Sequence, residues 1–427
     1  MFRLLPALFA LLFPSTFCAQ TIYLHCGRLL TMTGEQAQTE MTIVVEGSRI
    51  ARIEKGYLQA PAGVEAVDLK STTVLPGLID CHVHLEWEQS RNSYNERFTL
   101  NDVDIAFRAA VYAGRTLQAG FTTVRDLGGR GINIALRNAI NQGWVQGPRI
   151  LATGRIISIT GGHGDSTTGA RWDLFDPPPA AEEGVADGTD ACRKAVRAQV
   201  KNGADLIKVT ATGGVLSLAR DGRLPHYADD ELQAIVRTAA DLGVPVAAHA
   251  HGDEGMRRAV EAGVSSIEHG TFMSDSTMAL MKQRGTWLVP TLTAGWAVSD
   301  SAQYAPGFFP ELVRLKALGI DPQLTATLSR AYQHGVRIAF GTDAGVFPHG
   351  KNNLEFYYMA QAGMRPWDIL RSATADAAIL LGLQADIGVL APGKLADVVA
   401  VDGNPLADIR AMEKVAFVMK AGKRVAG

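Results

Sequence analysis

The chain has 427 residues, of which 47% are hydrophobic and 20% are charged, and its formal net charge is −2. This balance is typical of a globular protein, and a charge so close to zero gives no reason to expect nucleic acid or an anionic membrane surface as a partner. Beyond the first twenty residues only Cys26, Cys81 and Cys192 remain, which is too few for a disulfide framework, so the hydrophobic core must stabilise the fold.

The first twenty residues form a segment of their own. Arg3 is followed by an apolar stretch at 4–13 and then by small and polar residues, which is the layout of a secretory signal peptide. The stretch is too short to span a membrane as a helix. Cys18 raises the alternative of a lipid anchor, but Phe17 in front of it fits that signal poorly. We expect residues 1–19 to be removed and the protein to be exported, to the periplasm or outside the cell, with no integral membrane segment.

Short strand patterns fill both ends of the remaining chain. Near the N-terminus they are TIYLHCGRLLTM, MTIVVEGSRIARIEKG and GVEAVDLKSTTVLP. Near the C-terminus, DIGVLAPGKLADVVAVDGNP and VAFVMKAGKRVAG are strand-like as well. We expect residues 20–75 and 385–427 to form one small β-sandwich built from both termini.

The middle of the chain, residues 76–384, alternates strand and helix patterns. The strand patterns lie at 78–84, 121–127, 149–154, 205–211, 244–251, 265–270, 286–292 and 336–345. Helical periodicity lies between them, for example at 103–119, 131–142, 187–202, 229–242 and 252–262. Eight strand–helix units predict an α/β fold, the (β/α)8 TIM barrel. An open doubly wound sheet is the structural alternative, but no G-x-G-x-x-G opens a helix here to support it.

Polar residues that can bind a metal stand in or at the ends of five predicted strands. In the first of these, VLPGLIDCHVHL, two histidines are one residue apart, and side chains at i and i+2 of a strand share a face. The carboxyl ends of all barrel strands meet at one face, where enzymes of this fold carry out catalysis. We therefore expect one site that contains His82, His84, Lys208, His249, His251, His269 and Asp343.

Each of these residues has a simpler interpretation on its own. A single histidine at a strand end can be structural, and an aspartate close to a glycine can form a turn. Lys208 inside LIKV must be buried in an ion pair, or must reach solvent from an edge strand. Taken together, at the ends of the right strands, these residues favour a shared metal site.

These segments resemble those of the amidohydrolase superfamily of metal-dependent hydrolases. The matching motifs are LPGLIDCHVHL, IKVTATGG, AAHAHG, IEHG and GTDAG along the barrel, and LAPGKLADVVAVDGNP near the C-terminus. Within the superfamily, ISITGGHGD, ATGGVLS and AHAHG are most similar to dipeptidases that act on Xaa-Pro, Xaa-Arg or Xaa-Lys and to ochratoxin-type amidases. The resemblance implies a hydrolase that cleaves an amide bond and releases a C-terminal amino acid from a dipeptide or an N-acyl amino acid.

The same resemblance implies a centre with two divalent metal ions. The residues that would hold them are His82, His84 and Asp343 for the first ion, and His249 and His269 for the second. Lys208 would be carboxylated on Nζ and bridge both ions, because burial favours the neutral amine that captures carbon dioxide. Zinc is the expected metal for imidazole and oxygen donors, with manganese or cobalt as alternatives. Asp343 would accept the proton of the attacking water and deliver it to the leaving amine.

Other functions stay open on the sequence alone. His251 and Glu254, in HGDE, fit the His-x-x-Glu of single-metal deaminases of this fold, and imidazolone-opening hydrolases of cyclic amides carry a similar segment. A catalytically inactive barrel kept as an exported binding protein is a third alternative. Lys208 favours the two-metal hydrolase, because a single-metal site has no use for a bridging carbamate.

A dipeptide or N-acyl amino acid presents a free carboxylate, so the site should offer hydrogen-bond donors. The candidates for substrate binding are His163, Arg223, Tyr227 and His251, of which His163 and His251 would also help to neutralise the oxyanion. Nothing in the sequence selects proline, arginine, lysine or an aromatic residue as the amino acid released. Many relatives assemble into rings, so the resemblance also implies a homo-oligomer.

Overall fold

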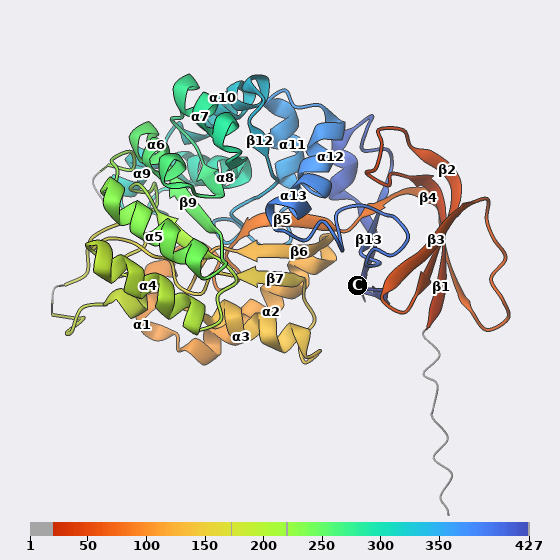
Figure 1. Ribbon diagram of the computed structural model, residues 1–427, viewed down its shortest axis with the longest axis horizontal. Coiled ribbons are helices and arrows are strands. Elements are labelled where there is room, and N and C mark those ends of the chain that lie inside the picture. Colours follow the sequence, from red (N-terminus) through yellow and green to blue (C-terminus); the bar gives the residue numbers. More distant parts are fainter. Residues whose placement is uncertain (1–19, 172, 219–220, 426–427) are drawn as a thin grey trace, which may run out of the picture.

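The computed structural model describes residues 20–171, 173–218 and 221–425. The predicted signal peptide, residues 1–19, lies outside the described residues. A β domain lies at one end of the molecule and an α/β barrel at the other (Figure 1). Across the described ranges, no helix is both long and apolar enough to cross a membrane.

The β domain is built from both ends of the chain. Its strands form one seven-stranded sheet in the order β15–β14–β13–β4–β1–β2–β3. Their bounds are β1 Thr21–Leu29, β2 Gln38–Glu46, β3 Arg49–Lys55, β4 Glu65–Pro76, β13 Val398–Asp402, β14 Val415–Lys420 and β15 Lys423–Arg424. The central strand β4 pairs in parallel with β1 and antiparallel with β13, so it joins the first and last parts of the chain by hydrogen bonds.

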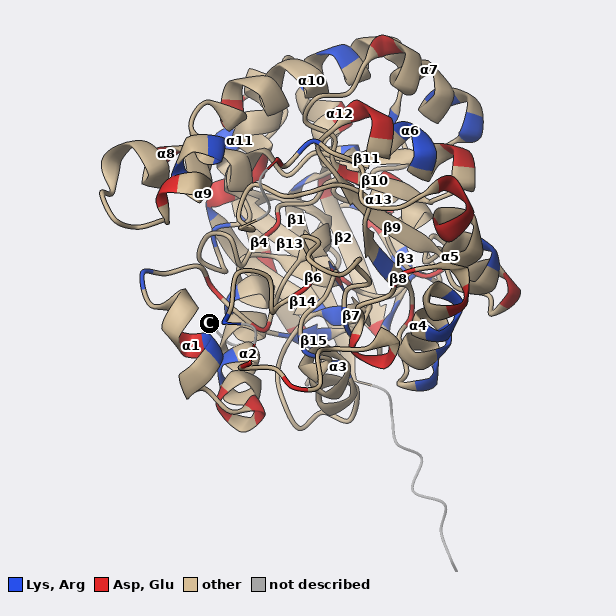
Figure 2. Ribbon diagram, turned by 90° about the vertical axis from the view of Figure 1, so that its left-hand side faces the viewer, with Lys and Arg blue, Asp and Glu red and all other residues tan. Residues whose placement is uncertain are grey.

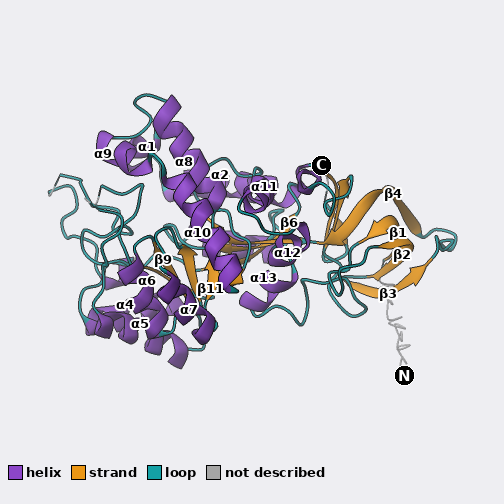
Figure 3. Cartoon of the chain, turned by 90° about the horizontal axis from the view of Figure 1, so that it is seen from above, coloured by secondary structure: helices purple, strands orange, loops and turns teal. Residues whose placement is uncertain are grey.

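Alternating apolar side chains give this domain a core of its own. Leu24 of β1, Ile43 of β2 and Val398 of β13 are completely buried in one cluster. The sequence predicted a sandwich of two layers, whereas the described strands belong to a single hydrogen-bonded sheet that encloses this apolar layer. Figure 3 shows the domain beside the barrel, away from most of the helices.

The barrel contains the eight parallel strands that the sequence predicted. They are β5 Leu78–Val83, β6 Phe121–Asp126, β7 Arg149–Ala152, β8 Ile207–Thr210, β9 Val246–Ala250, β10 Ser266–His269, β11 Trp287–Val289 and β12 Arg337–Ile338. A three-stranded and a five-stranded sheet make up the barrel. Bridges between Ile157 and Val209 and between Val83 and Ala344 join the two sheets. Because helices cover the strands, most of these strands are buried along their whole length.

Helices surround the barrel in alternation with its strands. The predicted ones are α2 Asp102–Gln118, α3 Ile132–Asn141, α4 Thr189–Lys201, α5 Asp229–Asp241 and α6 Asp253–Ala262. Further along the chain are α7 Asp275–Arg284, α10 Ile320–His334, α11 Leu354–Gln361, α12 Pro366–Ser372 and α13 Ala375–Leu380. Acidic and basic residues are interspersed over these outer helices, in keeping with a net charge near zero (Figure 2).

Three more helices interrupt the strand–helix alternation, and the sequence did not predict them. They are α1 Ser93–Thr99, α8 Leu292–Tyr304 and α9 Glu311–Ala317. In Figure 3 all three lie on one side of the barrel. Residues of α1, α8 and α9 line the cavity described below, so these insertions build its walls.

Candidate metal centre and active site

The residues that the sequence singled out at strand ends converge on one cavity of about 520 Å³. Its lining includes His82, His84, His163, Lys208, His249, His251, His269 and Asp343. Most of these side chains come from the last residues of β5, β9 and β10 or from the residues just beyond, while Lys208 lies within β8, Asp343 follows β12 and His163 lies on the loop after β7. The barrel therefore brings together at one face residues that are far apart along the chain.

His82, His84 and Asp343 form a buried group whose ligand atoms all lie within 4.8 Å of one another. Oδ1 of Asp343 lies 3.4 Å from Nε2 of His82 and 3.2 Å from Nε2 of His84. On the far side of its ring, Nδ1 of His82 donates to Glu268 at 2.9 Å. Nδ1 of His84 donates to the backbone oxygen of Gly128 at 2.8 Å. With the ring protons on Nδ1, lone pairs of the two Nε2 atoms and of Oδ1 face each other, and a cation among them would stabilise this arrangement.

The electrostatics of this group also favour a positive charge. Burial alone would lower the pKa of His84, but the carboxylate of Asp343 raises it above its ordinary value. Burial would raise the pKa of Asp343, but His82 and His84 hold it below its ordinary value. Either a proton or a metal ion would supply the positive charge that this group favours.

Buried hydrogen bonds fix this group in place. Asp80, in β5, accepts from the backbone nitrogen of His82 at 3.0 Å. It also accepts from the backbone nitrogen and the hydroxyl of Thr342, at 3.1 and 2.6 Å. Because Thr342 directly precedes Asp343, these contacts set the position of Asp343 relative to His82.

His249 and His269 face the first group from β9 and β10. The ring centroid of His269 lies 5.1 Å from that of His82 and 4.7 Å from that of His249. Nδ1 of His269 is 2.7 Å from the hydroxyl of Thr291, which leaves Nε2 for an ion. Nε2 of His249 is 3.0 Å from the backbone oxygen of Gly213, which leaves Nδ1. Each ring is thus oriented by one nitrogen and can bind a metal with the other.

Lys208 lies between these two groups and is 2% exposed. Its Nζ is 3.5 Å from Nε2 of His82. No carboxylate oxygen of the described residues lies within 4.0 Å of Nζ, so Lys208 forms no direct ion pair, although the charges of Glu268 and Asp343 raise its pKa from a greater distance. Burial lowers the pKa of Lys208 to about 8, so an appreciable fraction of the amine is neutral near neutral pH. A neutral buried amine at this point is compatible with carboxylation.

His163 and His251 extend the second group into a cluster of four imidazoles. The ring of His163 stacks on that of His249 at 4.4 Å, and the ring of His251 lies 5.0 Å from that of His269. Burial lowers the pKa of His163 to about 3 and that of His251 to about 4, so both are neutral at physiological pH. Nδ1 of His163 is buried against Gly214 without a hydrogen-bond partner.

Unusual backbone conformations occur at the same place. His269, Thr291 and Asp343 have φ angles of 69°, 52° and 59°, in the left-handed region that side chains with a Cβ rarely adopt. Such conformations occur where the surrounding structure holds them, most often at functional sites. Here they occur at two candidate ligands and at the hydroxyl that orients one of them.

Two of the predicted substrate-binding residues lie elsewhere. Tyr227 is 1% exposed and packs in the barrel core, and Arg223 pairs with Asp221 at 3.3 Å on the surface. Neither is among the described residues that line the cavity. The reason is the path of the loop after β8, whose two arms pair through a bridge between Thr212 and Pro225. Its second arm therefore returns to the barrel wall.

Glu254, the proton carrier of a single-metal deaminase, also lies outside the described cavity lining. It belongs to α6 and pairs with Arg257 at 2.9 Å and Arg258 at 2.8 Å. Hydrogen bonds from these arginines lower its pKa to about 2. A carboxylate held in this way is a poor proton shuttle, which weakens the deaminase alternative.

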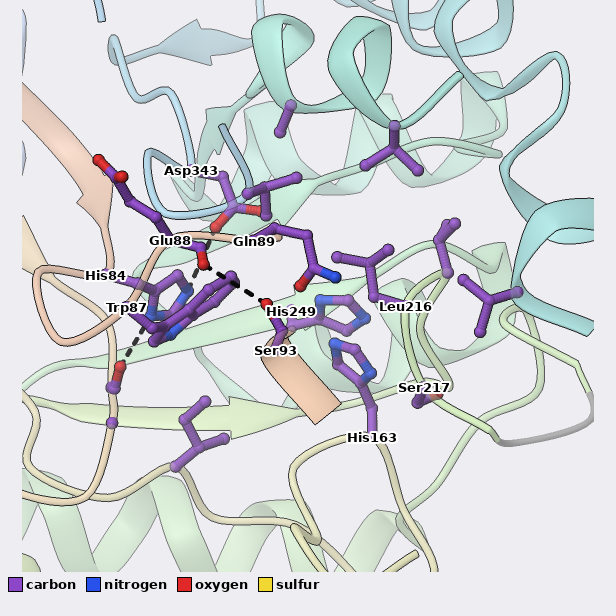
Figure 4. Close-up of a pocket in the computed structure, with 18 of the residues that line it drawn as sticks. His84, Trp87, Glu88, Gln89, Ser93, His163, Leu216, Ser217, His249 and Asp343 are labelled. Carbon is purple, nitrogen blue, oxygen red and sulfur yellow. Dashed lines mark hydrogen bonds and ion pairs between the residues drawn. The ribbon is translucent and has the colours of Figure 1, made fainter. Parts of the chain in front are cut away.

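The cavity also contains residues that the sequence did not single out. They are, among others, Trp87, Gln89, Arg91, Arg97, Leu216 and Phe308. The indole of Trp87 stacks on His84 at 5.3 Å, and Figure 4 shows Gln89 and Leu216 around the rings of His163 and His249. Trp87, Gln89 and Leu216 lie on the loops after β5 and β8, where sites of this fold are built, but a loop sequence does not reveal which side chains turn inwards.

Comparison with known proteins gives one family match and three similar proteins. The profile of the amidohydrolase family matches residues 73–425. Ochratoxinase from Aspergillus niger is 33% identical over 440 residues, which cover 98% of this chain and 89% of that protein. A crystal structure of a Xaa-Pro dipeptidase with methionine bound in its active site has a TM-score of 0.92 at 45% identity, covering 96% of this chain and 100% of that one. A prolidase complexed with N-methylphosphonate-L-proline has a TM-score of 0.85 at 30% identity, covering 95% and 99%.

Proposed function

Because this chain belongs to the amidohydrolase family and is a metal-dependent hydrolase acting on amide bonds, we propose that it releases the C-terminal amino acid from a dipeptide or an N-acyl amino acid. The observation that carries this proposal is the convergence of six candidate ligands on one cavity. The Xaa-Pro dipeptidase, the prolidase and the ochratoxinase, each similar over nearly the whole chain, support amide substrates of this kind.

The proposal includes a centre for two divalent ions, with zinc as the expected metal. His82, His84 and Asp343 would hold one ion, and His249 and His269 the other. A carboxylated Lys208 would contribute one oxygen to each. Three observations support this assignment: the opposed lone pairs of the first group, the one unengaged nitrogen on each ring of the second group, and the buried Lys208, whose pKa is lowered.

The bound ions supply a Lewis acid for the substrate carbonyl and lower the pKa of water. Asp343 stays ionised, since His82 and His84 hold its pKa down, and can take one proton from the attacking water. As the C–N bond breaks, Asp343 returns that proton to the leaving amine, and the products are a carboxylate and a free amino acid. His163 and His251 are neutral and can donate hydrogen bonds to the carbonyl oxygen as its charge develops.

A panel of substrates, read together with metal content, tests the proposal. Dipeptides and N-acyl amino acids are compared with cyclic ureides and aminopurines on protein purified with its metal. Release of a free amino acid with about two metal ions per chain is the expected result. Release of ammonia would favour a deaminase, and opening of a ring would favour a cyclic-amide hydrolase. A chain that binds no metal would be an inactive barrel.

Export and self-assembly are further parts of the proposal. The pattern of residues 1–19 supports a cleaved signal peptide. N-terminal sequencing of the mature protein, with a start near residue 20, would agree with it. Light scattering of the purified enzyme tests the homo-oligomer, and a monomer would contradict it.

A further inference from the structure

One wall of the cavity is strongly apolar. It is formed by the loop after β8, by α8 and by the segment that leads into α9. The residues on this wall include Val215, Leu216, Val298, Phe308, Phe309 and Val313. They pack into a hydrophobic cluster of their own, and of these six residues only Val215 also packs against the barrel core. We call this surface the apolar wall.

A lysine side chain links the two elements that form the apolar wall. Lys316, in α9, donates from Nζ to the backbone oxygens of Gly214 and Ser217, at 2.8 and 2.7 Å. These two residues enclose Val215 and Leu216. The loop after β8 and helix α9 are therefore fixed to each other, and the wall is part of the folded structure.

The acidic residues of the cavity outside the metal group are already engaged. Glu86 accepts from the backbone nitrogens of Arg130 and Asn133, at 2.5 and 2.8 Å, and Asp165 accepts from Gly161 and Thr167. Glu88 accepts from the backbone nitrogen of His349 at 2.8 Å, and Glu96 pairs with Arg108 at 3.0 Å. These carboxylates are held by other groups of the protein, and none of them belongs to the apolar wall, so a basic substrate side chain packed on that wall finds no carboxylate among its residues. Such a side chain would lose its hydration against apolar groups without compensation.

Positive charge lies next to the apolar wall. Arg91 lines the cavity, donates to the backbone oxygen of Pro306 at 3.0 Å, and places its guanidinium 5.8 Å from the ring centroid of Phe308. Its described hydrogen-bond partner is a carbonyl, so its charge is not neutralised there by a carboxylate. A carboxylate that binds Arg91 would bring the side chain on the same α-carbon close to Phe308.

From these contacts we infer that the released amino acid carries a bulky, uncharged apolar side chain, such as that of methionine, leucine or phenylalanine, which packs on the apolar wall while its carboxylate meets Arg91. This inference rests on the proposed function, because only the released residue has a free carboxylate beside its side chain. It excludes arginine and lysine as the preferred residues.

The test compares N-acetylated amino acids that differ only in the released residue. For the metal-loaded wild type, kcat/KM for N-acetyl-methionine and N-acetyl-leucine should exceed that for N-acetyl-arginine and N-acetyl-lysine by about 100-fold or more. A preference for arginine or lysine would overturn this inference alone. No hydrolysis of any N-acetyl amino acid or dipeptide would overturn the proposed function, and this inference with it.

A second experiment places a negative charge on the apolar wall. Leu216→Glu should reduce turnover of N-acetyl-leucine and raise the arginine-to-leucine ratio of kcat/KM at least about tenfold. Leu242→Glu, at an exposed position after α5, is the matched control and should leave the ratio unchanged. Leu216→Ala, which tests the wall without adding a charge, should lower kcat/KM for N-acetyl-leucine more than for N-acetyl-alanine. An unchanged substrate profile in both Leu216 variants would overturn the inference.

Discussion

At the scale of single residues, Glu268 supports the candidate site without lining the described cavity. It is completely buried in β10, binds Nδ1 of His82 at 2.9 Å and pairs with Arg125 at 2.8 Å. Burial alone would raise the pKa of Glu268, but Arg125 and His82 lower it to about 2, so it is ionised at every physiological pH. An anionic partner on Nδ1 keeps the ring proton there and makes Nε2 a stronger ligand.

Glu268→Gln should therefore weaken metal binding by about 10–100-fold, because the amide orients His82 less strongly and does not polarise it. Titration against a chelator of known affinity measures the change. Glu254→Gln is the matched control, since that glutamate pairs with arginines on the outer face of α6 and its loss should leave the affinity unchanged. Equal metal affinity in the Glu268 variant and the wild type would contradict the proposal that Glu268 orients and polarises His82.

Lys208→Ala should abolish both metal loading and turnover, because it removes the proposed bridge between the two ions. Elemental analysis of the purified variant and an assay with an N-acyl amino acid measure the two effects. Lys282→Ala, at a surface lysine of α7 that bonds the backbone of His334, should change neither. Near-normal activity of the Lys208 variant would remove the carbamate from the proposal.

The sequence predicted the orientation of a side chain correctly where that side chain lies on a strand. His82 and His84 could be placed on one face because the two-residue period of a strand leaves no other arrangement. Tyr227 and Arg223 could not be placed in this way, because a loop can turn a side chain to the core, to solvent or to the cavity. The structure brings neither into the cavity lining as described.

At the scale of elements, α8 depends on a carboxylate from another helix. Its first backbone nitrogens, on Leu292 and Thr293, donate to the completely buried Glu355 of α11 at 2.8 and 2.7 Å. These contacts satisfy donors that a helix leaves unpaired at its N-terminus, and the negative charge suits the helix dipole. Because Thr291 directly precedes α8 and orients His269, the capped end of α8 also holds one candidate ligand.

The stability of wild type relative to Glu355→Gln should depend on pH. Burial raises the pKa of Glu355 to about 7 in spite of its hydrogen bonds, whereas the unfolded chain should titrate near 4.3. The folded state therefore binds the proton more tightly, so wild-type stability should fall relative to the variant as pH rises from about 4.3 to about 7. Urea unfolding of both proteins across this range measures the difference. A constant difference would contradict the raised pKa.

The sequence predicted regular elements better than insertions. Every predicted barrel strand segment contains a strand of the structure, because buried parallel strands are short apolar runs between helical patterns. The helices α1, α8 and α9 were not predicted. Each lies between a strand and the helix expected to follow that strand. The alternation of strand and helix patterns therefore did not predict them. The apolar wall depends on α8 and α9, which is why the sequence could not select a substrate.

At the scale of the whole molecule, the candidate ligands come from strands all around the barrel. They lie on or just after β5, β8, β9, β10 and β12, and bridges at Ile157 and Val83 join the two sheets to which these strands belong. The ion proposed for His82, His84 and Asp343 would connect the end of β5, in one sheet, to the segment after β12, in the other. We therefore expect metal binding to stabilise the entire barrel.

Removing the metal should lower the Tm of the protein. At a free metal concentration 1,000 times the Kd, binding contributes about 4 kcal/mol, which corresponds to a fall of several degrees in a chain of this size. Calorimetry before and after chelation measures it, and zinc added back should restore the original Tm. An unchanged Tm in protein whose metal is shown to be gone would contradict a stabilising role.

The pairing of β4 with β13 has a consequence for biosynthesis. About 320 of the 427 residues lie between the two strands along the chain, so one edge of β4 stays unpaired during about three quarters of translation. The barrel can be complete before the final strands leave the ribosome, and the β domain closes last. Premature termination even shortly before Val398 would leave that edge bare, open to aggregation rather than to correct closure.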